Sequence, residues 1–171
     1  SVIPPGIPWA YNANVPKYPV DIKKANGLLD EAGYPKNAVG MRFQLRLAFE
    51  AGNDNSERPV QILREQLKAV GIDIKLERFE RSVMLEKVFQ KYDFDMWFGP
   101  LTTRGHPALG TARLYTTTSI TGKPFTNFTR YSNPKVDQLF EQAVTATKKQ
   151  DMAKAYHAVQ DILMRDLPTI P

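Results

Sequence analysis

The sequence predicts an α/β fold, in which an open and mainly parallel sheet is flanked by helices and followed by a carboxy-terminal helical hairpin. Three strand-like segments alternate with helix-like segments between residues 21 and 98. Two strand–helix–strand units in succession favour parallel neighbours joined by right-handed crossovers. After residue 130, two segments with helical periodicity follow one another with no strand between them, which predicts the hairpin.

Proline density sets the first twenty residues apart. Prolines stand at positions 4, 5, 8, 16 and 19, and no regular element tolerates that spacing. We expect residues 1–20 to form an extended linker segment that lies across the domain, with Trp9 and Tyr11 as anchors. Residues 21–171 are then expected to form a single α/β lobe.

Local signals define the elements of that lobe. Asp21 is predicted to cap a helix over residues 21–32, because its carboxylate can accept hydrogen bonds from the free amides of the first turn, and Gly33 ends this helix. Alternation and helical periodicity give the elements that follow. These are strands over 41–49, 72–79 and 92–98, and helices over 60–70, 82–90, 107–115, from Asn133-Pro134 onward, and from Asp151 to Pro168.

Composition excludes several classes of function. The chain of 171 residues is long enough to bury a core, and its 42% hydrophobic and 24% charged content fits a soluble globular protein. It has no run of eighteen apolar residues, and no cysteine for a disulfide, a thiolate metal site or a nucleophile. The net charge of +5 is scattered among acidic residues, so nucleic-acid binding has little support.

Catalytic and metal-binding patterns are weak. No phosphate-binding glycine motif and no nucleophile elbow is present, and the two histidines, His106 and His157, lie far apart. Asp93 and Asp95 share a strand face and could hold a divalent cation, but capping of the strand start or pairing with a nearby lysine is favoured. We therefore expect no catalytic residue, no metal site and no cofactor.

Four segments, in the same order and with the same spacing, resemble motifs of the extracellular solute-binding proteins of family 5. These proteins are the peptide-, nickel- and oligosaccharide-binding proteins of ABC importers. The segments are YPVDIKKANGLLDEAGYPK, PVQILREQLKAVGIDIKLERFE, KYDFDMWFGP and the ending from Asn127, which contains YSNPKVDQLF and closes on LPTIP.

The resemblance implies a lobe with the type II topology of periplasmic binding proteins, cut from a longer chain as its carboxy-terminal lobe. Such proteins hold a small solute (a peptide, an opine, a sugar or an anionic compound) in a cleft between two lobes and present the closed form to the membrane subunits of an ABC permease. It implies a binding protein with no enzymatic activity, monomeric, and periplasmic or extracellular. A membrane anchor in a missing amino-terminal segment stays an open alternative.

The loop after the third strand is the expected ligand site. In peptide-binding relatives this loop carries an acidic residue that pairs with the amino terminus of the peptide. Here Thr102, Thr103 and Arg104 stand in its place, so a carboxylate, a phosphate or a hydroxyl-rich ligand suits the loop better. The residues expected to contact ligand are Phe49, Glu50, Trp97, Pro100, Leu101, Thr102, Thr103, Arg104, Asn127 and Phe128. Tyr115 is also expected to face the cleft.

Two other functions stay open at this point. Related lobes occur as ligand-sensing domains of transcriptional regulators, so a sensor domain is the main alternative. A small α/β hydrolase or transferase would need a nucleophile–base pair, which this sequence does not offer. For the first function, we expect the isolated chain to fold but to bind no ligand tightly, because half of the cleft is missing.

Overall fold

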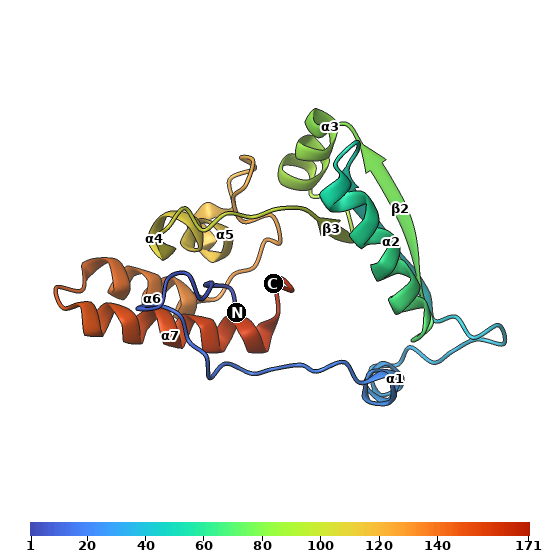
Figure 1. Ribbon diagram of the computed structural model, residues 1–171, viewed down its shortest axis with the longest axis horizontal. Coiled ribbons are helices and arrows are strands. Elements are labelled where there is room, and N and C mark those ends of the chain that lie inside the picture. Colours follow the sequence, from blue (N-terminus) through green and yellow to red (C-terminus); the bar gives the residue numbers. More distant parts are fainter. The chain divides into compact units, whose positions relative to one another are not determined.

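The computed structural model describes all 171 residues and divides them into two compact units. The first unit contains residues 1–17 and 101–171, and the second unit contains residues 18–100. The chain therefore leaves the first unit after Lys17 and returns to it at Leu101 (Figure 1). No helix combines the length and the apolar character needed to cross a bilayer.

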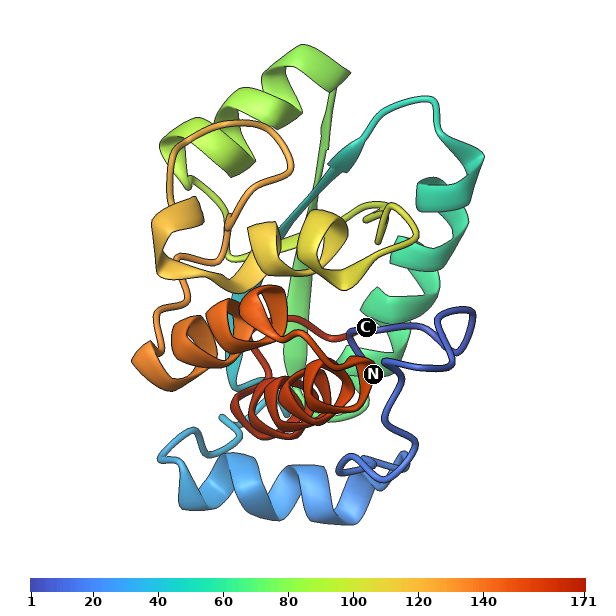
Figure 2. The same ribbon diagram turned by 90° about the vertical axis from the view of Figure 1, so that its left-hand side faces the viewer.

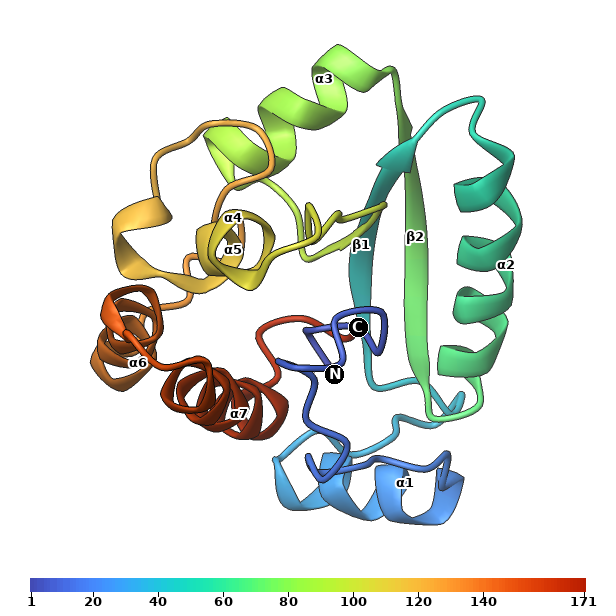
Figure 3. The same cartoon turned by 60° about the vertical axis from the view of Figure 1, so that its left-hand side comes forward.

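The second unit is built on a parallel sheet of three strands in the order β2-β1-β3. β1 covers Phe43–Glu50, β2 covers Ile72–Phe79 and β3 covers Met96–Phe98. Helix α2 (Asp54–Lys68) joins β1 to β2 and lies along the sheet (Figure 3). Helix α3 (Arg81–Leu85) and the π-helical turn η1 (Glu86–Lys91) join β2 to β3. The predicted parallel α/β fold is confirmed.

The core of the second unit lies between the sheet and α2. Leu47, Phe49, Val60 and Ile74 are buried there, because alternate residues of β1 point to the same face of the sheet. Trp97 belongs to the opposite face, where its indole ring meets the ring of Phe89 edge-on at 5.4 Å between ring centroids.

Helix α1 (Ile22–Glu31) begins as predicted, since Asp21 Oδ1 accepts a hydrogen bond from Lys24 N at 2.8 Å. No residue of α1 is buried. The guanidinium of Arg42 instead attaches the helix to the sheet by donating to Asp30 Oδ1 at 2.5 Å and to Asn26 Oδ1 at 2.9 Å.

Several element boundaries differ from the prediction. Helix α2 starts before residue 60 because the Asn53 side chain accepts from Asn55 N and caps it there. The helix expected over residues 82–90 is helix α3, which has no side-chain cap, followed by the π-helical turn η1. The segment expected as one helix over 107–115 is two short helices, α4 (Pro107–Gly110) and α5 (Ala112–Tyr115).

The third strand is shorter than predicted because its first residues are held by side chains. Tyr92 adopts a left-handed conformation, with φ of 53°. Asp93 Oδ1 then accepts from Arg46 Nη1 and Asp93 Oδ2 accepts from Lys87 Nζ, both at 2.7 Å. Asp95 accepts from the backbone amide of Arg46 at 2.8 Å. The expected pairing of one of these carboxylates with a nearby lysine is confirmed for Asp93.

This pairing predicts a specific acid sensitivity. Lys87 and then Arg46 lower the pKa of Asp93 to about 2, so the folded state favours its carboxylate form. Its contribution to the stability of the second unit is therefore present above pH 4 and is lost as the pH falls toward 2. We expect Asp93→Asn to flatten the pH dependence of urea unfolding across this window.

The matched control for this prediction is Glu31→Gln, which removes an exposed carboxylate at the end of α1. In that control, the urea midpoint measured from pH 2 to pH 6 should change with pH as steeply as in the wild-type chain. A slope in Asp93→Asn as steep as in the wild-type chain would show that Asp93 does not contribute.

The first unit is built on the predicted helical hairpin. It pairs α6 (Pro134–Thr145) with α7 (Lys149–Asp166), and the two helices lie side by side in Figures 1 and 2. Asn133 caps α6 by accepting from Lys135 N at 3.0 Å, as its Asn-Pro signal indicated. The short 3₁₀ turn η2 (Thr117–Ser119) lies between α5 and α6 in the sequence.

Residues 1–17 form part of the core of the first unit. They contain no helix or strand, as the prolines predicted, but Ile3, Ile7 and Ala10 are buried against the hairpin. Trp9 is an anchor, with its ring 5.8 Å from that of Tyr156. This grouping differs from the expected boundary at residue 20, and the assignment of residues 21–171 to one lobe stays a prediction.

The side chain of Gln160, fully buried in α7, fixes this segment. Its Oε1 accepts from Ser1 Oγ at 2.7 Å and from Asn12 N at 3.0 Å. Its Nε2 donates to Ala10 O at 2.7 Å and to Tyr156 O at 2.9 Å. One buried amide thus satisfies groups from two parts of the chain that are about 150 residues apart.

Candidate functional site

The carboxyl ends of the three strands share one edge of the sheet. The register places Glu50 opposite Phe79 and Phe49 opposite Phe98. Open α/β sheets bind their ligands outside this edge. The chain leaves β3 through Gly99 and Pro100 and continues directly into the loop of residues 101–106, so the loop that the sequence singled out follows the expected edge.

The predicted site residues of the second unit have different environments. Glu50 forms an ion pair with Arg81, with 3.0 Å between Glu50 Oε2 and Arg81 Nη1. The indole of Trp97 lies against the backbone of Gly99, where a Cβ atom would be 2.3 Å from the ring. Phe49 is 2% exposed and packs in the core under α2, so we leave it out of the site proposed below.

The loop of residues 101–106 belongs to the first unit and has an unusual backbone. Arg104 and Gly105 are both left-handed, with φ of 49° and 72°. Gly110 of α4 lies against the Thr103 backbone so closely that a Cβ atom would be 2.0 Å from Thr103 O. His106 Nδ1 accepts from Ala108 N at 3.2 Å and so caps α4.

The side chain of Arg113, in α5, holds the loop from its other side. Its Nε donates to Gly110 O at 3.3 Å and its Nη2 donates to Thr102 O at 3.4 Å. Partial burial, and secondarily the positive charge of Arg104, lower the pKa of Arg113. No sequence motif indicates this role, because the partners of Arg113 are backbone carbonyls.

Asn127 and Phe128 lie between α5 and α6 in the sequence, and both are buried. Asn127 Nδ2 donates to Thr116 O at 3.0 Å and to Tyr131 O at 2.8 Å, and its Oδ1 accepts from Thr129 Oγ1. Asn127 therefore organises the segment between α5 and α6. Tyr115 is buried as well, with 2.6 Å between its Oη and Thr169 Oγ1.

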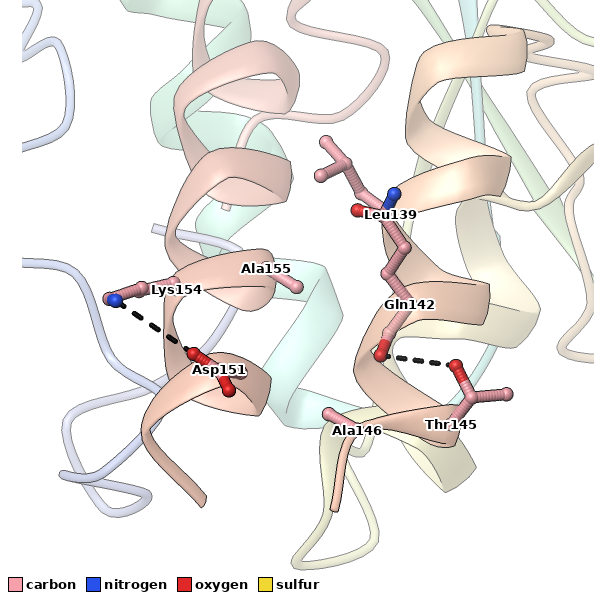
Figure 4. A pocket seen from close by; sticks show the side chains of 7 residues that line it. All are labelled: Leu139, Gln142, Thr145, Ala146, Asp151, Lys154 and Ala155. Carbon is pink, nitrogen blue, oxygen red and sulfur yellow. Dashed lines mark hydrogen bonds and ion pairs between the residues drawn. The ribbon is translucent and has the colours of Figure 1, made fainter. Parts of the chain in front are cut away.

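A shallow recess at the tip of the hairpin lies outside the predicted site. Figure 4 shows the side chains that line it, from Leu139, Gln142, Thr145, Ala146, Asp151, Lys154 and Ala155. Its charged groups satisfy each other, with 3.8 Å between Lys154 Nζ and Asp151 Oδ1, and Thr145 Oγ1 donates to Gln142 O. The recess has no converging free polar groups that would fix a ligand.

The fold and the loop after β3 define an α/β lobe of the type II class of periplasmic binding proteins. The chain belongs to the bacterial extracellular solute-binding proteins of family 5, because the model of the middle region of that family matches residues 1–123. The family resemblance inferred from the sequence motifs is confirmed.

The chain is similar to several characterised proteins. It is 28% identical over 169 residues to heme-binding protein A of Haemophilus influenzae, covering 99% of this chain and 30% of that protein. It is 29% identical over 175 residues to glutathione-binding protein GsiB of Escherichia coli K12, covering 99% of this chain and 33% of that protein. The oligopeptide-binding protein AppA of Bacillus subtilis, solved with a nonapeptide, aligns with a TM-score of 0.81 and 26% identity over 94% of this chain and 33% of that one.

The chain thus spans about a third of the length of the curated relatives that it matches.

Proposed function

We propose that this chain is the carboxy-terminal lobe of an extracellular solute-binding protein, which delivers a small polar solute to the membrane subunits of an ABC permease. The observation that carries the proposal is the similarity over 99% of the chain to proteins named for binding heme and glutathione. None of the relatives reported above is a transcriptional regulator, so the sensor-domain alternative has no support. Membership of a family described as extracellular supports a periplasmic or extracellular location.

The proposed ligand contacts follow the edge of the sheet and the loop. In the second unit they are Glu50, Trp97 and Pro100. In the first unit they are the loop residues Leu101, Thr102, Thr103 and Arg104, together with Phe128, which follows Asn127 in the sequence. Trp97 offers an aromatic surface fixed by its packing on Phe89, and the loop offers hydroxyl and guanidinium donors. Asn127 supports this set by ordering its own segment rather than by contact with solute.

Binding, rather than covalent chemistry, is what these groups can perform. His106, the histidine of the loop, already accepts a hydrogen bond at Nδ1 from Ala108 N of α4. The solute would bind the closed arrangement of the complete protein more tightly than the open one and so shift the protein toward it. The permease would then recognise that closed arrangement. We propose that the protein acts as a monomer and has no enzymatic activity.

The test is native mass spectrometry of the full-length protein, purified without added ligand. We expect a retained solute whose occupancy falls when Arg104 is replaced by alanine. Loss of one charge-assisted contact should weaken binding by about 10- to 100-fold. Lys123→Ala removes an exposed cation of the same unit and should leave occupancy unchanged.

Two results would count against the proposal. A full-length protein that retains no solute, and that shows no binding in a calorimetric screen of peptides and small anions, would contradict the function. Tight binding of a solute by the 171-residue chain alone would contradict its role as one half of a cleft.

A further inference from the structure

We infer that Arg104 and Arg113 together recognise one acidic group of the solute, a carboxylate or a phosphate. This inference rests on the proposed function, and it adds to it a second binding residue and a class of ligand. It concerns only the first unit, where Arg104 belongs to the loop of residues 101–106 and Arg113 of α5 donates to that loop.

The hydrogen bonds of Arg113 leave most of its donors available. A guanidinium has five N–H groups in a planar fork. The contacts to Gly110 O and Thr102 O use the Nε–H and one N–H of Nη2, so three N–H groups have no partner in the chain. The two bonds hold the fork in a fixed orientation against the loop that carries Arg104, which lowers the entropy lost when an anion binds.

The charge around this pair is unbalanced. Arg113 is half-buried and its pKa is lowered by desolvation and by the neighbouring cation of Arg104, with no carboxylate opposing them. Neither arginine forms an ion pair in the chain. By contrast, Arg46 in the second unit is paired with Asp93 and Asp95, and those carboxylates raise its pKa.

Three of the five acidic residues of the first unit accept hydrogen bonds away from this pair. Asp137 accepts from Thr117 N, Asp166 accepts from Tyr131 Oη and Asp161 accepts from Asn12 Nδ2. The first unit contains ten lysines and arginines against five aspartates and glutamates, whereas the second unit contains thirteen of each. The whole net charge of the chain therefore lies on the unit that carries Arg104 and Arg113.

The threonines of the loop add neutral donors. The hydroxyl groups of Thr102 and Thr103 form no hydrogen bond within the chain, although the backbone carbonyls of both residues do. Thr102 is exposed and Thr103 is half-buried. The guanidinium and the two free hydroxyls of the loop, with the guanidinium of Arg113 that donates to it, match the acceptor oxygens of a carboxylate or a phosphate, and the two positive charges repel an ammonium group.

The experiment follows the Nε–Hε signals of the arginines in the 171-residue chain by NMR. The probes are sodium acetate and inorganic phosphate, each titrated at ionic strength held constant with sodium chloride. We expect a saturable shift of the Arg113 signal with at least one of the two anions. Arg104→Gln should weaken the fitted affinity about tenfold while leaving the bonds of Arg113 to the loop intact. The control Lys123→Gln should not change it.

The anion that binds more tightly identifies the acidic group. No saturable shift with either anion, or the same affinity in Arg104→Gln as in the wild-type chain, would overturn the inference. These outcomes are separate from those of the proposed function. If the full-length protein retains a solute that has no acidic group, the role of the two arginines is contradicted and the proposed solute binding stands. If the Arg113 signal shifts but the full-length protein retains no solute, anion binding by the arginines stands and the proposed function is contradicted.

Discussion

Replacement of Gly110 by alanine is expected to destabilise the first unit by about 2–4 kcal/mol and to displace the loop that carries Arg104. A Cβ atom at position 110 would lie 2.0 Å from the carbonyl oxygen of Thr103, 2.1 Å from its carbonyl carbon and 2.3 Å from its Cα. All three are backbone atoms, so no rotamer change can relieve the overlap. Either the loop or helix α4 must move.

A matched control exists in α1. Gly27 lies inside that helix with no heavy atom within 4 Å of a built Cβ, so Gly27→Ala should stabilise the second unit by about 0.5–1 kcal/mol through helix propensity alone. Urea unfolding followed by circular dichroism measures both variants. Retained wild-type stability in Gly110→Ala, with an unchanged Arg104 NMR signal, would show that the close approach at Thr103 is not required.

The second large effect is expected at Gln160. Replacement by leucine keeps an apolar body of similar size in α7 but leaves the Asn12 amide and the Ala10 carbonyl buried without partners. Each unsatisfied group costs about 1–3 kcal/mol, so the first unit should lose about 3 kcal/mol. The segment of residues 1–17 should also detach more often from the hairpin, because its polar attachment to α7 is reduced.

Hydrogen exchange at the Asn12 amide and limited proteolysis after Lys17 report on that detachment directly. Gln150→Leu, an exposed position at the start of the same helix, is the control and should behave like the wild-type chain. The proposed role of Gln160 fails if the two leucine variants unfold at the same urea concentration.

The sequence predicts those parts of the fold that depend on neighbouring residues. Asp21 and Asn133 cap their helices as expected, because a cap needs only the amides two or three residues away. The length of β3 could not be predicted from neighbouring residues in the sequence. It is set by Lys87 and Arg46 acting on Asp93, and only the folded sheet brings Arg46 to that carboxylate.

The candidate site shows the same division. Thr102, Thr103 and Arg104 are proposed from the sequence because they lie in the loop that follows a strand. The core position of Phe49 and the structural role of Asn127 depend on burial, which residue type alone does not define. Arg113 was missed because its role arises from the fold of the loop against α4, and a lone arginine in a short helix usually indicates nothing more than a solvated surface.

The interrupted first unit has a consequence for how the protein folds during synthesis. Residues 18–100 are one continuous segment, so the second unit can form as soon as it has left the ribosome. Ser1 and Asn12 meet Gln160 across separations of 159 and 148 residues, and those contacts can form only after α7 has been made. Until then Ile3 and Ile7 lack their packing partners in the hairpin. Until the hairpin has been made, the apolar side chains of residues 1–17 therefore lack the partners that bury them, and transiently exposed apolar surface of this kind is prone to aggregation.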